Sequence, residues 1–415
     1  MHTLSLSMIV KNGGEDLLHC LQSVVGIVDE MVVADTGSTD NSIEIARDFG
    51  ATVIEIPWTD DYAAARNLAL AEVSSDWVLQ LDADEALPPY ASQRVPNILR
   101  QATGQVGGFV LLQKSFVANR FTSSEGRLAR ANDESTGRSA RAVAYTETRT
   151  TRLFRRHPGI FYTGIIHESV DQQLLHSGFT KLAVSDFHIN HYGPLNDSLS
   201  EAKKRYYRDL CYRKTIQQPL NHMAWRELGA VQYLLGEYDE VMRCMEREYA
   251  LSGHPLPLYY MAKVQHDRGH LAQALQFLDR MPDTGDLGFA KRQLVGDILA
   301  RLGRLEEARF AYGEALAMID PSPEYRSWKP VLESKLGYVE VRLGEGDCGL
   351  ERLNRALSET PDVYESYDRL MKALIILGRL PQAADVAEEM QKHFPSKKTA
   401  LRASALRAKA GEADL

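Results

Sequence analysis

Five glycines recur at near-regular intervals through the second half of the chain, and this repeat constrains the fold more than any other feature. They are about 34 residues apart, with one longer interval between the third and the fourth. The glycines are Gly236, Gly269, Gly303, Gly344 and Gly378. The fifth residue after each is Val241, Ala274, Ala308, Gly349 or Ala383, and prolines at 321, 361 and 395 close three of the units. A turn glycine followed by a small residue at this period predicts stacked helix pairs.

We therefore predict an all-α solenoid over residues 218–415, with about five helix pairs and a final helix near 398–410. The repeat resembles the tetratricopeptide pattern. Residues 225–229 (WRELG) fit that pattern, whereas Gln232 stands where tyrosine is usual. The resemblance implies a concave groove suited to an extended peptide or a protein partner. The alternative is that these helices only stabilise the rest of the chain or join two copies into a homodimer.

The first part of the chain alternates short apolar runs with segments of helical periodicity. Strands are predicted at 4–10, 31–34, 52–56 and 77–81, with helices at 17–25, 43–49 and 62–73 between them. Loops this short predict a parallel α/β sheet with right-handed crossovers. We place this domain at residues 1–196 and a connecting helix at 197–217.

Acidic residues follow two of these strands. Asp35 ends the second strand, and Asp82 and Asp84 end the fourth. Open α/β sheets bind ligands at this edge, and two carboxylates separated by one small residue can hold one hard divalent cation. Taken alone, residues 82–84 are more typical of an acidic strand end in solvent than of a metal site.

The middle region returns to strand-like alternation after a polar stretch. Residues 107–116 form a predicted strand, and residues 118–144 lack apolar periodicity, which indicates either a mobile loop that closes on substrates or a surface insertion. Further strands are predicted at 151–156 and 160–168, the latter ending at His167 and Glu168, and at 186–193. Arg152 and Arg155 face opposite sides of their strand, so at most one points into a site.

Four motifs in this order and spacing resemble family 2 glycosyltransferases with the GT-A fold: SMIVKN at 7–12, DEMVVADTGSTD at 29–40, ARNLAL at 65–70 and LDADE at 81–85. An RLFR strand, a His-Glu pair and a His-Tyr-Gly turn extend the resemblance to about the first half of the chain. It implies that Asp82 and Asp84 bind Mn²⁺ or Mg²⁺ on the diphosphate of a nucleotide sugar. Asp35 would contact the nucleoside, and Arg66 would neutralise phosphate or orient the acidic loop.

Two departures from the family pattern affect the nucleoside site. The family often has a second acid where this chain has Thr36, and its close relatives usually carry acids where this chain has Gly13 and Gly14. Nucleoside contacts are therefore expected to differ. Asn12 and Arg152 complete the predicted nucleotide-sugar contacts.

Sugar transfer needs a base for the acceptor proton and positive charge for the departing diphosphate. Glu168 is the predicted base, with Asp171 and Asp186 as weaker alternatives. His191 is the predicted third metal ligand, because Mn²⁺ accepts imidazole beside carboxylates. His167 and His188 would bind phosphate or pack.

The predicted function is a metal-dependent, inverting hexosyltransferase that moves a sugar from a UDP-linked or similar donor to a peptide or protein acceptor. The repeats and a resemblance to bacterial peptide glycosyltransferases favour that acceptor. An envelope glycan or lipid-linked acceptor is the first alternative. Others are an inactive transferase-fold scaffold that binds proteins through its repeats, and a nucleotidyltransferase, for which no triphosphate loop is present.

Charge, apolar runs and cysteine spacing limit the partners and the location that can be expected. A net charge of -8 argues against general binding to nucleic acid or anionic membranes. No apolar run is long enough to span a membrane and no leader pattern opens the chain, so a cytoplasmic protein is predicted. The four cysteines, Cys20, Cys211, Cys244 and Cys348, are scattered and are predicted to be buried, reduced thiols.

Overall fold

The computed structural model describes residues 2–118, 123–124, 127–132, 134, 137–196, 200–321 and 323–413. The chain forms two compact units, Met1–Glu240 and Val241–Leu415. The first unit continues past the predicted boundary at 196 and includes the helices α7 (Glu201–Gln217) and α8 (His222–Leu235). These helices belong to it because α7 bonds to the α/β region: the Tyr206 hydroxyl donates to Asp60 at 2.7 Å, and the Lys214 ammonium donates to the Ile166 carbonyl oxygen at 2.9 Å.

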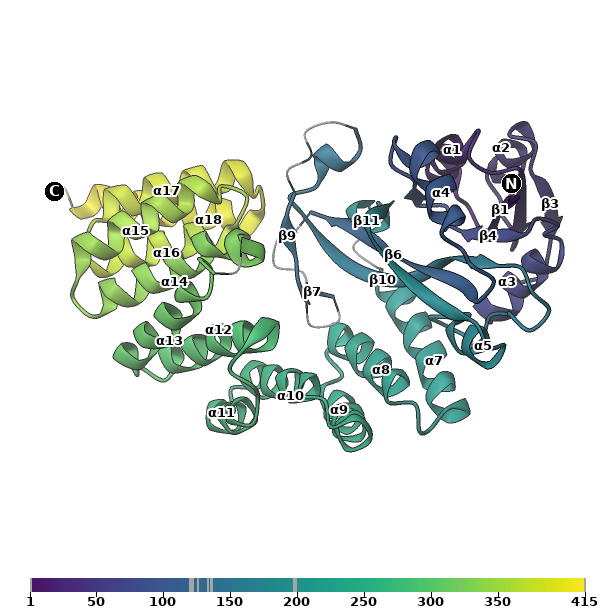
Figure 1. The fold of residues 1–415 in the computed structure, drawn as a ribbon. Coiled ribbons are helices and arrows are strands. Elements are labelled where there is room, and N and C mark those ends of the chain that lie inside the picture. The colour runs from purple at the N-terminus through teal and green to yellow at the C-terminus, as the bar shows by residue number, and fades with distance from the viewer. Residues whose placement is uncertain are drawn as a thin grey trace. The chain divides into compact units, whose positions relative to one another are not determined.

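A mixed sheet forms the centre of the first unit (Figure 1). The strand order is β3-β2-β1-β4-β10-β6-β11-β5, with β9 paired to β10. The strands are β1 (Leu4–Val10), β2 (Glu30–Asp35), β3 (Thr52–Glu55), β4 (Trp77–Gln80), β5 (Glu85–Ala86), β6 (Val106–Val117), β9 (Arg130–Ala131), β10 (Ala144–Arg155) and β11 (Thr180–His191). A separate two-stranded ribbon joins β7 (Ser123–Ser124) to β8 (Arg127–Leu128).

The first four strands are parallel, as predicted, but the sheet beyond them is mixed. β10 runs antiparallel to both β4 and β6, and β5 runs antiparallel to β11. The described residues between β6 and β10 contain no α-helix, and β10 lies beside β6 in the opposite direction.

Helices cover both faces of the sheet. α1 (Gly14–Val24), α2 (Ser42–Asp48) and α4 (Ala91–Arg100) share one apolar core with Leu6 and Leu79 of the sheet. α3 (Tyr62–Ala71) and α5 (Asp171–His176) share the opposite core with Val32 and Val78. Neighbouring strand residues thus supply opposite faces, which follows from the two-residue period of a strand.

The strand predicted over residues 160–168 is wrong. The chain forms a turn there, which reciprocal backbone hydrogen bonds between Thr163 and Ser169 close at 3.0 and 3.1 Å. Positive φ angles at Gly164 and His167 reverse the chain, which is incompatible with a continuous strand. The segment predicted as a mobile loop, 118–144, lies partly outside the described residues. In its described part, β9 pairs with β10 and Ser139–Arg141 forms a short 3-10 helix.

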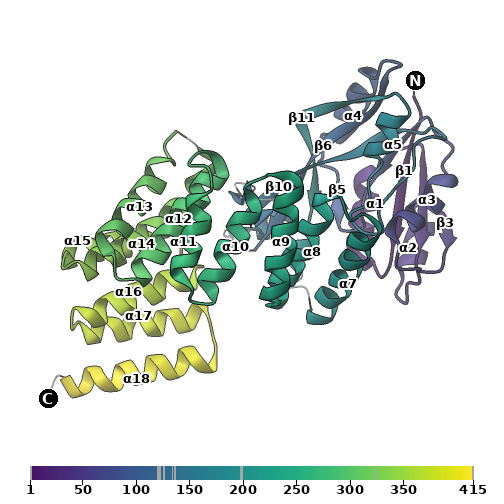
Figure 2. The ribbon, with the colours of Figure 1, turned by 90° about the horizontal axis from the view of Figure 1, so that it is seen from below.

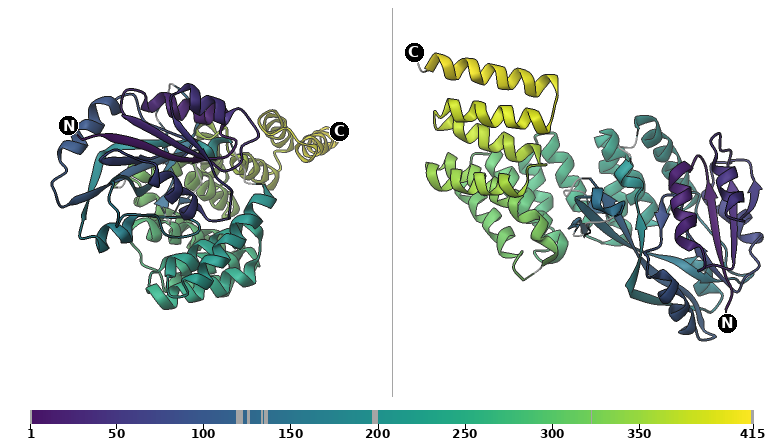
Figure 3. Two further views of the ribbon diagram at one scale, coloured as in Figure 1. Left: turned by 90° about the vertical axis from the view of Figure 1, so that its right-hand side faces the viewer. Right: turned by 90° about the horizontal axis from the view of Figure 1, so that it is seen from above.

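The second unit is built from the predicted helix pairs. α9 (Tyr238–Ser252) crosses the boundary between the units, and the helices that follow pack on their neighbours in sequence. They are α10 (Leu256–Asp267), α11 (Leu271–Asp279), α12 (Gly285–Arg301), α13 (Leu305–Ala317), α14 (Lys329–Arg342), α15 (Gly346–Glu359), α16 (Tyr364–Ile376), α17 (Leu380–His393) and α18 (Lys397–Ala413). Figures 2 and 3 show the last of them as a stack that ends at α18.

The repeat residues take the positions that the period predicts. All five turn glycines have positive φ angles, between 71° and 93°. The residues that stand five positions after them are buried, and at Gly349 a Cβ atom would lie 2.5 Å from the carbonyl oxygen of Gly337, where α15 crosses α14. A short helix, Pro323–Trp328, lies in the longer interval between the third and fourth glycines.

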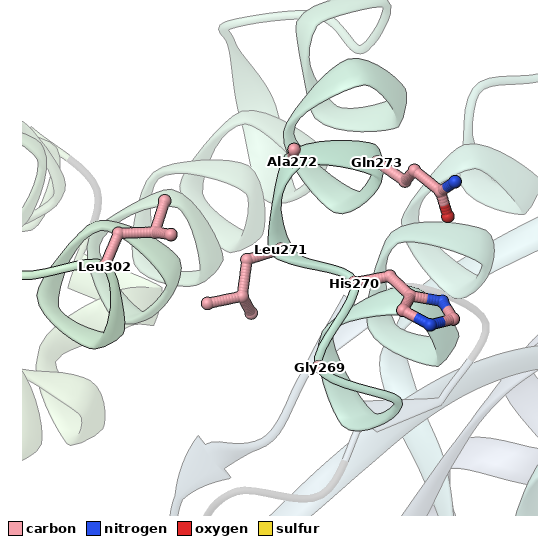
Figure 4. A pocket seen from close by; sticks show the side chains of 6 residues that line it. All are labelled: Gly269, His270, Leu271, Ala272, Gln273 and Leu302. Carbon is pink, nitrogen blue, oxygen red and sulfur yellow. The ribbon is translucent and has the colours of Figure 1, made fainter.

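A hollow of about 430 Å³ lies in the second unit at the turns between repeats (Figure 4). Leu271 and Leu302 point toward each other across it, whereas His270 and Gln273 point away from this pair. The hollow is local and does not run along the helix stack, so the predicted peptide groove stays a prediction.

Three of the four cysteines are buried, as predicted, and Cys348 is exposed, which corrects the prediction for that residue. Cys348 lies in the first turn of α15, whose buried residues begin at Gly349 and Leu350. Among the described residues, no helix combines the length and the apolar character needed to cross a membrane.

Candidate active site

Arg66 joins two of the predicted site residues. It lies on α3, and its side chain is only 6% exposed. One guanidinium nitrogen donates to Asp82, and Nε donates to Glu168, whose side chain is 10% exposed. The turn at 163–169 therefore brings Glu168 to the end of β4, although no strand carries it there.

Arg152 of β10 binds the same cluster from the other side of Asp82. Its Nη2 atom donates to Asp82 Oδ2 at 3.1 Å and to Glu85 Oε1 at 2.8 Å. Arg155 lies on the opposite face, with its guanidinium 4.8 Å from the ring centroid of Trp77. Only one of the two arginines enters the cluster, which is the outcome that the strand period predicts.

Glu85 is the member of the cluster that sequence reasoning missed. Its side chain is fully buried and accepts hydrogen bonds from Arg152, from Gln113 and from the backbone N–H of Asp82. Burial raises the pKa of Glu85, and the charge of Arg152 only partly opposes this effect. The available signal was its place as the third acid of LDADE, at the start of a new strand.

Asp82 is the acid at the centre of the cluster. Burial alone would raise its pKa, but the charges of Arg66 and Arg152 outweigh burial and lower it. Both Asp82 oxygens accept from guanidinium groups, so its first role in this structure is to hold the two arginines together.

Asp84 points to a different partner, His191. Asp84 Oδ2 lies 3.5 Å from His191 Nε2, and the Ser115 hydroxyl lies 2.9 Å from Nδ1 of the same ring. A Cβ atom on Gly193 would lie 2.3 Å from Asp84 Oδ2 and 2.9 Å from His191 Nε2, so glycine leaves open the space between these two groups. Burial lowers the pKa of His191, but Asp84, Glu85 and Asp82 together raise it above its ordinary value.

This pair fits a divalent cation. One carboxylate oxygen and one imidazole nitrogen face a space that a side chain at 193 would fill, and Mn²⁺ accepts this donor set. Asp82 is held by Arg66 and Arg152, so the geometry fits Asp84 and His191 better as ligands than Asp82.

Asp35 and Asn12 lie at the neighbouring strand ends. Asp35 is buried, and its Oδ2 atom accepts from the backbone N–H groups of Gly37 and Ser38 at 2.9 Å. Its Oδ1 atom has no hydrogen-bond partner within the described residues. Asn12 accepts from the backbone N–H of Thr39 at 2.7 Å, so its amide oxygen braces the loop that follows Asp35.

The two alternative bases lie outside the cluster. Asp171 accepts from the Lys181 ammonium at 2.8 Å and from the Thr151 hydroxyl. Asp186 pairs with Arg94, and its side chain is 66% exposed. His188 contacts the hydroxyl of Tyr90 at 3.1 Å. Of the three candidate bases, Glu168 alone joins Asp82.

The first unit is thus an α/β domain with a buried charge cluster at the carboxyl ends of its parallel strands. Residues 5–158 match the model of glycosyl transferase family 2, and residues 258–341 match that of a tetratricopeptide repeat-like domain. The chain therefore carries a family 2 glycosyltransferase domain followed by a tetratricopeptide repeat-like region.

Curated relatives match different shares of the chain. A TPR repeat-containing protein of Synechococcus elongatus is 30% identical over 287 residues, which are 66% of this chain and 64% of that protein. An uncharacterized glycosyltransferase of Rickettsia felis is 39% identical over 87 residues, 21% of this chain and 30% of that protein. The SPbeta prophage-derived glycosyltransferase SunS of Bacillus subtilis is 24% identical over 205 residues, 49% of this chain and 43% of that protein. This chain spans less than two thirds of the length of each.

Proposed function

We propose that the first unit transfers a sugar from a nucleotide diphosphate sugar, with UDP-linked donors as the first candidates, to a peptide or protein acceptor. The observation that carries the proposal is the cluster of Arg66, Arg152, Asp82 and Glu168 at the strand ends. The family of the domain and the glycosyltransferase names of two relatives support it.

Unused polar atoms in the cluster match the parts of such a donor. Arg66 Nη1 and Arg152 Nε are buried and, among the described residues, have no hydrogen-bond partner. Unpaired guanidinium N–H groups favour an anion such as the diphosphate, whose charge grows as the sugar leaves. Asp35 Oδ1 is an unpaired acceptor at the next strand end, suited to a donor group of the ribose or the base.

Asp84 and His191 would hold the cation, which when bound neutralises charge on the diphosphate. Glu168 would accept the proton of the acceptor, and Arg66 would position it through the hydrogen bond to Oε1. Transfer would invert the anomeric centre, because the acceptor atom would displace the nucleoside diphosphate directly.

Calorimetric titration of the full chain with UDP- and GDP-sugars tests the donor site. We expect binding that Mn²⁺ strengthens, and loss of the Mn²⁺ effect in Asp84→Asn. Asp186→Asn is the matched control, because this exposed carboxylate lies outside the cluster. Failure of every donor to bind, or equal Mn²⁺ effects in wild type and Asp84→Asn, would contradict the proposal.

Peptide acceptors are tested by incubating the full chain with peptide arrays and a labelled donor that binds. Label on defined peptides supports the acceptor class, and loss of that label in Glu168→Gln with donor binding retained supports the base. Label transferred only to glycan or lipid-linked acceptors would replace the peptide proposal.

A further inference from the structure

A second group of metal-binding side chains lies in the first unit, outside the candidate active site. His167 of the 163–169 turn, Cys211 of α7 and Glu227 of α8 each offer one ligand atom, and these atoms lie within 4.8 Å of one another. The three residues come from separate segments that the fold brings together. The candidate active site uses none of them.

The segments are held together by a buried lysine. Lys214 stands three residues after Cys211, so both lie on one side of α7, and both are buried. The Lys214 ammonium donates to the Ile166 carbonyl oxygen at 2.9 Å and to Glu227 Oε2 at 2.8 Å. This ammonium disfavours a nearby cation, but its hydrogen bond is to Glu227 Oε2, and a carboxylate has a second oxygen that can bind a cation.

The turn directs two consecutive side chains to different partners. Glu168 points to Arg66, whereas His167 joins Cys211 and Glu227. His167 has a φ angle of 49°, in the left-handed region that non-glycine residues seldom adopt. The imidazole is exposed, so it can move the short distance that coordination requires.

We propose that His167, Cys211 and Glu227 bind a transition-metal cation, with Zn²⁺ as the first candidate. Sulfur, nitrogen and oxygen together suit Zn²⁺, whereas Mg²⁺ and Ca²⁺ prefer oxygen alone. Binding forms a sulfur–metal bond and releases the thiol proton of Cys211 to solvent. Water would fill the fourth position, and the cation would tie the turn that carries Glu168 to α7 and α8.

Titration of the metal-free full chain with Co²⁺ tests this site, because a cobalt–thiolate bond absorbs in the near ultraviolet. We expect the band to saturate at one equivalent, to disappear in Cys211→Ser and to need at least tenfold more Co²⁺ in His167→Ala. Zn²⁺ should displace Co²⁺ and remove the band. The exposed His167 provides a second variant if Cys211→Ser does not fold.

Two controls separate this site from the rest of the chain. Cys244→Ser removes another buried thiol and should keep the band. Asp84→Asn alters the candidate active site and should also keep it, so this result does not depend on the proposed function. The absence of a band in wild type, or a band that survives both Cys211→Ser and His167→Ala, would overturn the proposal.

Discussion

The two units use buried charge in different ways. In the first unit, Arg66 and Arg152 converge with three carboxylates at one sheet edge. In the second unit, half-buried charges join two helices of the same repeat, as where Arg352 of α15 bonds to Glu333 and Glu340 of α14. In the first unit, Arg66 Nη1 and Arg152 Nε are buried and have no hydrogen-bond partner among the described residues, so they can bind a ligand. A change in this cluster is therefore expected to affect both the stability of the first unit and ligand binding.

The largest loss of stability is expected from a change that breaks the charge cluster of the first unit. Arg152→Met would leave Asp82 and Glu85 buried with less compensating charge, and it should destabilise the first unit by about 3–5 kcal/mol. Urea unfolding followed by hydrogen exchange, which reports on the two units separately, measures this loss. Glu85→Gln combined with Arg152→Met should restore part of the lost stability, because fewer unpaired charges then remain buried. A loss below about 1 kcal/mol in Arg152→Met would show that the cluster is not a closed network.

A smaller loss of stability is expected from a change at the close crossing of α14 and α15 in the second unit. Gly349→Ala would place a Cβ atom 2.5 Å from the Gly337 carbonyl oxygen and 2.7 Å from Val341 Cγ2. We expect a loss of about 1–3 kcal/mol in that unit, with donor binding unchanged. Gly313→Ala is the matched control, because open space surrounds that position in α13, and it should stabilise the helix by up to about 1 kcal/mol. Equal effects of the two changes would argue against close packing at this crossing.

The smallest effect is expected on the pH dependence of stability. It can be compared for one carboxylate in each unit. Burial would raise the pKa of Asp368, but Lys372 and Arg402 lower it overall. The pKa of Asp171 is also lowered, because Lys181 and Thr151 outweigh the effect of burial. A lowered folded-state pKa stabilises the fold above the unfolded pKa of about 3.9, and this contribution disappears as the pH falls through the folded-state value.

Asp368→Asn should therefore cost about 1 kcal/mol at neutral pH and nothing in strong acid. Asp171→Asn should cost less, because its side chain is 40% exposed and that of Asp368 is 18% exposed. Chemical unfolding of both variants across the acidic range checks the order. Equal losses at neutral and strongly acidic pH would rule out ionisation as the cause.

Much of the fold could be predicted from local sequence. β1 has the bounds that its apolar run predicts, and the repeat glycines predict turns that have positive φ angles in the structure. Strand alternation also predicts that only one of Arg152 and Arg155 enters the site. Such features depend on the backbone geometry of a few consecutive residues, which the local sequence controls.

The sequence predicted several residues of the candidate site but not how they contact one another. Sequence placed Asp82, Arg66 and Glu168 among the candidates, but it misassigned the segment before Glu168 as a strand and overlooked Glu85. Apolar residues at 160–162 and 165–166 are typical of a strand, so the sequence pattern conceals the reversal at Gly164 and His167.

By itself, the sequence determined the repeat period, the strand and helix alternation and the presence of acids at strand ends, because these follow from local periodicity. Only the tertiary structure decided which charges pair: Asp82 with two arginines, Asp84 with His191, and Lys214 with Glu227. The physical reason is that a buried charge takes its partner from whatever segment packs against it, and that segment is distant in sequence. Cys211 illustrates this, since its spacing in the sequence predicts no metal site and only the fold places His167 and Glu227 beside it.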